Sequence, residues 1–320
     1  MRQRTIYNIL FILLVSCTSE LPVTPDLEQG QEQGVPVQFS VSIESEPDEN
    51  SRSAIETPYL PDNEEVGIYA LKGTLQNEEF TVTGNTREGW EWDETNIQTN
   101  FSNAKYIAYN YTDPEDPNQI TYHQLLPAQG TVTGKFPSVD NGALRFYAYY
   151  PYDADVTVGT DGQGTGRPIA PQINIKIGNS IEDTNDYMYT GPIDVSALQT
   201  EPVNLPLKHA LGRLNILVHT EQPTGNWREY PYVKSITVET FKSQEGVMNL
   251  ETGEITPGNM KLYTFTQNFE SDDYYYIMYS KSSPKLSPIY SNLFIPNIVN
   301  QTNFLYRIKL SIVNSECDED

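Results

Sequence analysis

The sequence predicts an all-β protein with two β-sandwich domains. It contains 22 Tyr, 22 Pro and 20 Gly, and tyrosine favours strands while proline and glycine favour turns. Many short strand-like segments, separated by Gly, Pro and Asn, follow one another, which is typical of sandwiches. A length of 320 residues fits two domains. We expect sandwiches at residues 35–202 and 203–320, with short helical turns near 118–125 and 194–198.

The net charge limits the possible partners. The chain carries 43 Asp and Glu against 20 Lys and Arg, so its formal net charge is −23. Binding to nucleic acid requires a basic surface, and we therefore expect no nucleic-acid partner. An electrostatic contact with anionic lipid is excluded for the same reason.

The N-terminus predicts export and lipid attachment. An apolar run at residues 6–15 is too short to span a bilayer as a helix but suits a secretory signal. It ends in Leu14-Val15-Ser16-Cys17, which resembles a bacterial lipobox. We expect residues 1–16 to be the signal peptide and Cys17 to receive the lipid that anchors the chain in the outer membrane. An ordinary signal peptide with an incidental cysteine is the alternative.

Residues 17–34 are polar and Pro-rich, so we expect a flexible tether there. The first strand follows, because apolar residues alternate with polar ones, the signature of a half-buried strand. Pro36 lacks an N–H, which restricts this strand to a sheet edge or Pro36 to the strand's first residues. Residues 144–151 are apolar on both faces, which predicts a strand between two covering layers. The apolar face of the first strand consists of Val35, Val37, Phe39, Val41 and Ile43.

The last strand mirrors the first, with apolar residues on one face and Arg307, Lys309 and Ser311 on the other. A sheet that lacks a strand is a template that a neighbouring molecule can complete. The alternative is that both terminal strands sit in their own domains. The apolar face of the last strand consists of Phe304, Tyr306, Ile308, Leu310 and Ile312.

Catalytic and metal-binding patterns are missing from the sequence. Its three histidines lack ligand spacing, no G-x-S-x-G is present, and Gly134-Lys135 is followed by Phe where a phosphate loop needs Ser or Thr. We therefore expect no catalytic residue, cofactor or metal. Trp90 and Trp92 would share one strand face. They are a possible contact for a glycan, and packing against a core is the alternative.

Several segments, taken in order, resemble the fimbrillin family of Bacteroides. Each is weak alone, but their order and spacing extend over nearly the whole chain. The segments are the lipobox, the alternating first strand, Arg52-Ser53, Val66-Gly-Ile-Tyr69, Phe146-Tyr-Ala-Tyr-Tyr-Pro151, Asp186-Tyr-Met-Tyr189, Val203-Asn-Leu-Pro-Leu-Lys-His-Ala-Leu-Gly-Arg-Leu214, Gly246-Val-Met-Asn-Leu-Glu-Thr-Gly253 and Leu293-Phe-Ile-Pro296.

The resemblance implies a pilus subunit or a related surface protein with two transthyretin-like sandwiches in tandem. Such subunits are exported as lipoproteins, and an arginine-specific protease removes the N-terminal strand to open a groove that a neighbour's strand fills. Here Arg52 would be the cleavage point, with an ordinary loop residue as the alternative. Seven residues follow the last strand. Either that strand is the donor, or the chain is an anchor, a tip or a non-polymerising relative.

We therefore expect a fimbrial subunit or accessory adhesin on the outer membrane, with other fimbrial subunits as partners and a surface glycan or protein as a further one. The alternative is a monomeric glycan-binding surface lipoprotein that uses Trp90, Trp92 and tyrosines. Strand exchange sets a condition. A first strand that is hydrogen-bonded on both flanks could not be swapped out.

Overall fold

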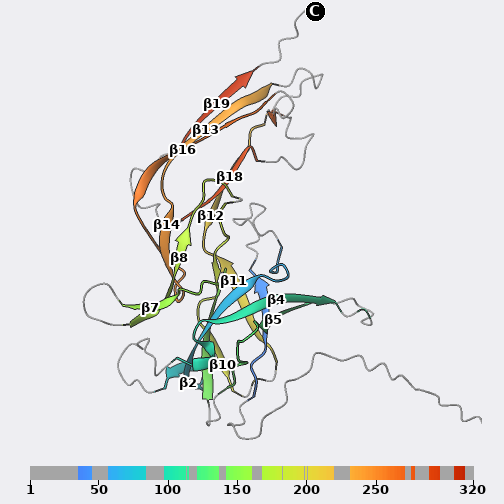
Figure 1. Ribbon diagram of the computed structural model, residues 1–320, viewed down its shortest axis with the longest axis vertical. Coiled ribbons are helices and arrows are strands. Elements are labelled where there is room, and N and C mark those ends of the chain that lie inside the picture. Colours follow the sequence, from blue (N-terminus) through green and yellow to red (C-terminus); the bar gives the residue numbers. More distant parts are fainter. Residues whose placement is uncertain are drawn as a thin grey trace, which may run out of the picture. The chain divides into compact units, whose positions relative to one another are not determined.

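The computed structural model describes part of the chain (Figure 1). Five predicted site residues, Cys17, Arg52, Trp90, Trp92 and Phe304, lie outside the described residues, as do the signal peptide and the tether. No helix in the described part is long and apolar enough to cross a membrane. The described residues are 35–44, 57–83, 97–112, 114, 121–136, 142–160, 168–181, 183–197, 199, 201–219, 231–270, 275–277, 288–295 and 306–313.

The all-β prediction is confirmed. Within the described ranges the only helical element is the short 3-10 turn η1 (Thr99–Phe101). The largest sheet has the strand order β10-β6-β9-β11-β1-β5-β4-β2-β3. Its strands are β1 (Phe39–Ile43), β2 (Glu65–Gln76), β3 (Glu79–Val82), β4 (Ala104–Thr112), β5 (Thr121–Pro127), β6 (Gly142–Tyr150), β9 (Met188–Tyr189), β10 (Ile193–Ser196) and β11 (Val203–His209).

This large sheet closes on itself, because β2 also pairs with β6 from Gly67↔Tyr149 to Thr74↔Gly142. The strands β6, β9, β11, β1, β5, β4 and β2 therefore form a continuous ring. Apolar side chains from all seven strands meet inside it and form the first core. Closure pairs strands that an open sheet would leave as edges. The interior includes Phe39, Ile68, Tyr106, Leu125, Phe146, Met188 and Leu205.

Strand β6 separates two cores, as its apolar sequence predicts. Leu144, Phe146 and Ala148 belong to the first core, inside the ring. Tyr147 and Tyr149 point the other way, into a second core. Successive residues of a strand face opposite sides, so a run that is apolar at every position can serve two cores.

A second sheet, with the order β15-β14-β8-β7, supplies the second core from the other side. It consists of β7 (Thr157–Thr160), β8 (Pro168–Lys176), β14 (Glu245–Asn249) and β15 (Ile255–Pro257). Strand β14 pairs antiparallel with β8, from Glu245↔Lys176 to Asn249↔Gln172. This sheet thus joins strands from both sides of residue 203.

The expected division at residue 203 does not follow the sheets. Strand β11 forms a ladder with β1 inside the ring, so the first sandwich extends at least through His209. The pairing of β8 with β14 crosses the same boundary. All described residues belong to one compact unit, Gly34–Asp320. The division into two transthyretin-like domains stays a prediction.

The remaining strands enclose a third core. One layer is the pair β12 (Gly212–Ile216) and β18 (Tyr290–Phe294). The other has β13 (Tyr232–Ser243) paired with β16 (Met260–Asn268), β17 (Tyr275–Tyr276) and β19 (Tyr306–Val313). The buried members of this core are Val233, Ile236, Val238, Ile277, Ile289 and Tyr290.

The two helical turns that the sequence suggested are wrong. Residues 121–127 form β5, which is antiparallel to β4 along its whole length. Residues 193–196 form β10, which is antiparallel to β6. In both segments the pairing with another strand decides the structure over a weak local preference for a helical turn.

Candidate functional site

Strand β1 lies between two other strands of the ring. On one side it runs parallel to β11, from Phe39↔Val203 to Ile43↔Leu207. On the other side it pairs with β5 at two positions, Phe39↔Leu125 and Ser40↔Gln124. We call the space that β1 fills between β5 and β11 the β1 slot.

Irregular segments extend the hydrogen bonds on the β5 side of the β1 slot. The amide of Val37 donates to the carbonyl oxygen of Gly134 at 3.0 Å, and the amide of Ile43 donates to that of Pro58 at 2.8 Å. Pro36, which has no N–H, forms an isolated bridge with Lys135 just before β1 begins. Pro36 therefore marks the beginning of an interior strand, and β1 is not an edge strand.

Phe39 is the centre of the β1 slot. Its ring contacts three others edge-on, with centroid distances of 5.7 Å to Phe101, 5.2 Å to Tyr106 and 5.1 Å to Phe146. Such edge-to-face contacts add to the stabilisation that comes from burial. Val37, Val41 and Ile43 are buried on the same side of the strand.

Val35 does not share this environment, although it continues the alternation. It is 52% exposed, whereas Val37 is buried, so the inward-facing part of the chain begins only at Val37. The opposite face of β1 is polar, as predicted. There the hydroxyl oxygens of Ser40 and Ser42 each lie 3.4 Å from Oδ1 of Asn204 on β11.

The pairing on both flanks contradicts a direct exchange of β1 from the uncut chain. Leaving the sheet would break the ladder with β11 and the bonds to β5, Gly134 and Pro58 together. It would also expose the buried apolar side chains of β1 to water. The condition set by the sequence is thus not met, and this pairing argues against exchange of β1.

Two segments that carry the family resemblance meet beside the β1 slot. His209, at the end of β11, places its Nδ1 3.1 Å from Oδ1 of Asp186. Only 2% of the Asp186 side chain is exposed, so this pair satisfies a polar group that would otherwise be costly to bury. The sequence indicated both segments but gave no sign that they touch.

An ion pair joins β6 to β10. Arg145 donates to both carboxylate oxygens of Asp194, at 2.5 Å from Nε and 2.8 Å from Nη2. These bonds raise the pKa of Arg145 above its ordinary value. The Arg145 guanidinium also lies 4.6 Å from the ring centroid of Phe80, within the range of a cation–π contact. These contacts fix the edge strand β10 to β6 and indicate no catalytic role.

The last strand pairs within its own chain. Strand β19 is antiparallel to β13 from Tyr306↔Thr240 to Val313↔Tyr232. Nη1 of Arg307 lies 3.0 Å from Glu239 on β13. The apolar face of β19 is incompletely covered, because Ile308 is 44% and Ile312 is 48% exposed. Leu310 is partly buried against the third core.

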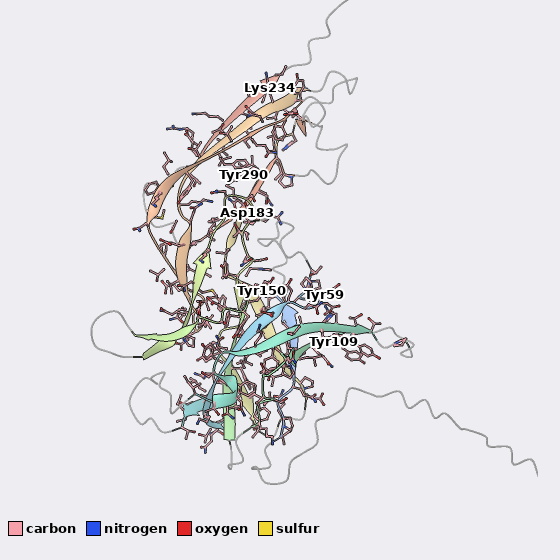
Figure 2. All side chains as sticks on the ribbon, in the orientation of Figure 1. Tyr59, Tyr109, Tyr150, Asp183, Lys234 and Tyr290 are labelled. Carbon is pink, nitrogen blue, oxygen red and sulfur yellow. The ribbon has the colours of Figure 1, made fainter. Side chains whose placement is uncertain are left out.

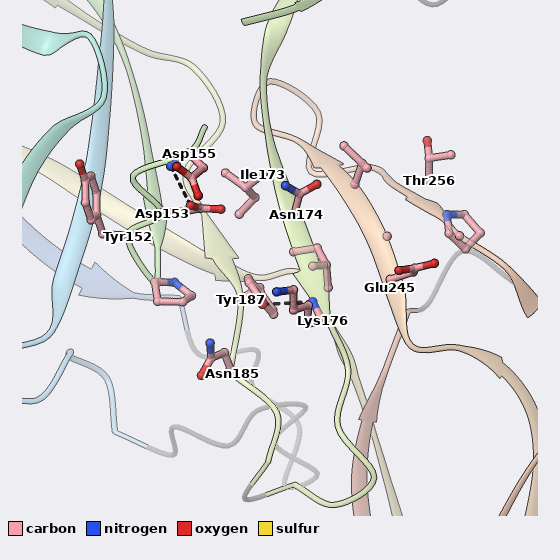
Figure 3. Close-up of a pocket in the computed structure, with 16 residues that line it drawn as sticks. Tyr152, Asp153, Asp155, Ile173, Asn174, Lys176, Asn185, Tyr187, Glu245 and Thr256 are labelled. Atoms are coloured by element: carbon pink, nitrogen blue, oxygen red, sulfur yellow. Dashed lines mark hydrogen bonds between the residues drawn. The ribbon is translucent and has the colours of Figure 1, made fainter. Parts of the chain in front are cut away.

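A groove of about 660 Å³ lies over β8, β14 and β15. Figure 3 shows Tyr152, Asp153 and Asp155 on one side and Glu245 and Thr256 on the other, with Lys176 and Tyr187 between them. The amide of Asp155 donates to Oδ1 of Asp153 at 2.9 Å, so the Asp153 carboxylate serves a local turn.

The groove gives no support to an enzyme. Its described lining includes no Ser, Cys or His that could form a nucleophile–base pair. In the part of the chain that the structure describes, no group of three His, Cys, Asp or Glu is placed to hold a metal ion. The structure brings none of the sequence-predicted site residues into this groove.

Comparisons with known proteins give a family. A family model described as fimbrillin-like matches residues 54–287, well over half of the chain. A comparison with curated proteins finds no match. One similar solved structure is a proposed cell adhesion protein of Bacteroides uniformis, with 12% identity, a TM-score of 0.47, and coverage of 89% of this chain and 86% of that one.

Another similar structure is a fimbrial protein of Bacteroides vulgatus. It has 16% identity and a TM-score of 0.45, with coverage of 87% of this chain and 88% of the other. The family match rests on the sequence itself and extends over most of the described strands. The chain therefore belongs to the fimbrillin-like family.

Proposed function

We propose that the chain is a fimbrial subunit or accessory adhesin that is exported as a lipoprotein and assembles after cleavage between β1 and β2. Family membership supports a role in adhesion or in a pilus. The single observation that supports assembly is the position of β1, which is one strand of the closed ring and lies close to the N-terminus. A cut at Arg52 would separate β1 from the rest of the ring.

Loss of β1 would leave a gap in the ring that a replacement strand could fill. The facing edges of β5 and β11 would lose their partner, and unpaired ladder groups readily accept another strand. Phe101, Tyr106 and Phe146 would lose their contacts with Phe39. Each large apolar side chain that refills such a space contributes about 1.5–3 kcal/mol.

The donor must be an extended segment with apolar residues at every second position. Strand β19 has this pattern in Tyr306, Ile308, Leu310 and Ile312. The exposure of Ile308 and Ile312 means that these side chains gain burial if they enter the β1 slot of a neighbour. The cost is the ladder between β19 and β13. We therefore propose β19 as the donor strand.

Treatment of the purified full chain with an arginine-specific protease tests this assembly. We expect release of the fragment that carries β1, detected by mass spectrometry, and ladders of oligomers on unheated gels. The reason is that only the cut chain offers an open β1 slot. The Arg52→Gln variant should stay monomeric under the same treatment.

A second variant tests the donor. Ile308→Asp with Ile312→Asp should be cleaved normally but form no ladder, because a charged side chain cannot enter the apolar ring. Both residues are well exposed in the monomer, so the fold should tolerate the changes. A cut chain that keeps its fragment or stays monomeric would refute assembly by exchange. Ladders from the double variant would refute β19 as the donor.

Lipid attachment at Cys17 is tested separately. We expect the Cys17→Ala variant to leave the membrane fraction after expression in a host that processes lipoproteins, because no thiol remains to carry the acyl chains. The wild-type chain should stay in the outer-membrane fraction and carry radiolabel from palmitate. A Cys17→Ala variant that remains membrane-bound would exclude this anchor.

A further inference from the structure

The hairpin of β4 and β5 extends beyond its neighbours in the ring. The two strands pair from Tyr106↔Pro127 to Thr112↔Thr121. Strand β2 pairs with β4 only as far as Ile107, and β1 reaches β5 only at Gln124 and Leu125. The outer part of the hairpin is therefore a two-stranded ribbon (Figure 1).

One face of this ribbon is covered. The ring of Tyr59 stacks on that of His123 with a centroid distance of 4.4 Å. Nδ1 of His123 lies 2.6 Å from Oδ1 of Asn110. The side-chain amide of Asn110 also donates to the carbonyl oxygen of Leu60 at 2.9 Å. The segment around residues 59–62 thus supports the ribbon from this side.

The opposite face is aromatic and partly exposed. Residues directly opposite in an antiparallel pair share a face, and Tyr111↔Tyr122 and Tyr109↔Gln124 are such pairs. Leu126 continues the same face. The exposed fractions are 45% for Tyr109, 42% for Tyr111, 45% for Tyr122 and 45% for Leu126. We call these four residues, together with Gln124, the tyrosine face; Figure 2 shows Tyr109 on the hairpin.

The rings of the tyrosine face are ordered relative to each other. Tyr109 and Tyr111 lie in nearly parallel planes, with an angle of 11° and a centroid distance of 6.4 Å. They occupy positions i and i+2 of one strand, so the rigid backbone fixes their spacing. A tyrosine side chain also loses little conformational entropy when it binds. The face is therefore organised before any ligand arrives.

The area of the tyrosine face decides between kinds of partner. Tyrosine and leucine side chains of roughly 200 Å² that are a little under half exposed leave about 350 Å² in all. A stable protein–protein interface needs about 800 Å² on each partner. A narrow linear ligand is therefore a better match than a protein surface.

The chemistry of the tyrosine face limits the class of ligand further. A phenol ring has an apolar surface and a polar hydroxyl edge, and Gln124 adds an amide beside Tyr109. A pyranose ring is similarly divided, with C–H groups on its faces and hydroxyl groups at its rim. The formal net charge of −23 disfavours nucleic acids and anionic polysaccharides.

We propose that the tyrosine face of the β4–β5 ribbon binds the chain of an uncharged polysaccharide, with sugar rings stacked on Tyr109, Tyr111 and Tyr122. This site is separate from the β1 slot and does not require assembly. It gives the adhesive role of the family a binding surface made from described residues.

The test uses the uncut full chain on an array of neutral polysaccharides (mannan, xylan, mixed-linkage β-glucan and starch) with heparin as the anionic probe. We expect binding to at least one neutral polysaccharide and none to heparin. Tyr109→Ala and Tyr122→Ala should each weaken that binding about tenfold, as loss of one stacking contact does elsewhere. Tyr109→Phe should retain most of it, because the ring remains.

Leu262→Ala is the matched control, because Leu262 is 66% exposed on β16, away from the ribbon. It should leave binding unchanged. Circular dichroism would verify that all variants fold. The proposal is overturned if no neutral polysaccharide binds, if Tyr109→Ala and Tyr122→Ala bind like the wild type, or if these variants instead abolish self-association of the uncut chain. Failure of protease-induced ladders would leave this result unaffected, so the two proposals fail independently.

Discussion

Replacement of Phe39 by alanine is expected to lower the free energy of unfolding by about 3–5 kcal/mol. Phe39 is 2% exposed and contacts the rings of Phe101, Tyr106 and Phe146 inside the closed ring of strands. The seven paired strands cannot easily move inward, so the missing ring leaves a cavity. Equilibrium unfolding in urea, followed by tryptophan fluorescence, measures the change.

Ser40→Ala is the control for the Phe39 variant. Ser40 is the next residue of β1 but faces outward, where its hydroxyl makes a long contact of 3.4 Å with Asn204. We expect a change below about 1 kcal/mol. A loss below about 1 kcal/mol for Phe39→Ala would mean that the interior of the ring can collapse around the gap. The closed ring would then not be the rigid receptor that strand exchange requires.

The sequence predicted the two faces of β1 correctly but not its neighbours. Alternation with a period of two is a local property, so Val37, Phe39, Val41 and Ile43 could be assigned to a buried face directly. The neighbours of β1 depend on β11, which lies about 160 residues further along the chain. Pro36 allowed either a sheet edge or a place at the beginning of the strand, and the second is found, since β1 begins just after it.

The missed strands lacked a local signal. In β5 only Leu125 is buried, so its sequence shows no alternation that could be read as a strand. Strand β10 is four residues long and alternates only once, from Ile193 to the buried Val195, which is too short a pattern to predict a strand. Its register depends on the pairing with β6 and on the Arg145–Asp194 ion pair. Pairing with other strands therefore decided both segments.

The candidate sites also divide into features that a local pattern predicts and features that depend on pairing between strands. The slot around Phe39 could be predicted in part, since the apolar face of β1 was evident. The tyrosine face could not, because it needs the register Tyr111↔Tyr122 to bring two strands together and the exposure of each ring to be known. The pair His209–Asp186 likewise joins segments whose contact depends on the ladder between β9 and β11.

The protein is expected to unfold steeply in alkali. Burial raises the pKa of six tyrosines, Tyr69, Tyr106, Tyr147, Tyr149, Tyr150 and Tyr290, and that of Tyr106 reaches about 12. In the unfolded chain each would ionise near pH 10, as indicated by the ordinary pKa of about 10. A group whose pKa is raised by folding contributes stability that is complete below its unfolded pKa. That stability is lost as the pH rises toward the folded value.

Each of these tyrosines reduces the free energy of unfolding by up to about 1.4 kcal/mol per pH unit in this window, so six reach about 8 kcal/mol per unit. Lys242 acts in the opposite direction, because burial lowers its pKa, but only below its unfolded pKa of about 10.4. Urea unfolding at a series of pH values, with tyrosinate absorbance as the second signal, measures the slope.

Two single variants separate this effect from a general sensitivity to alkali. Tyr106→Phe removes one ionisable group from inside the ring and should reduce the slope by about one sixth, since each group contributes one proton. Leu262→Ala changes an exposed side chain that cannot ionise and should leave the slope unchanged. Equal slopes for the wild type and Tyr106→Phe would mean that the interior admits water before the ring opens. A β1 slot that already admits water would provide less of the apolar burial that is expected to draw in a donor strand.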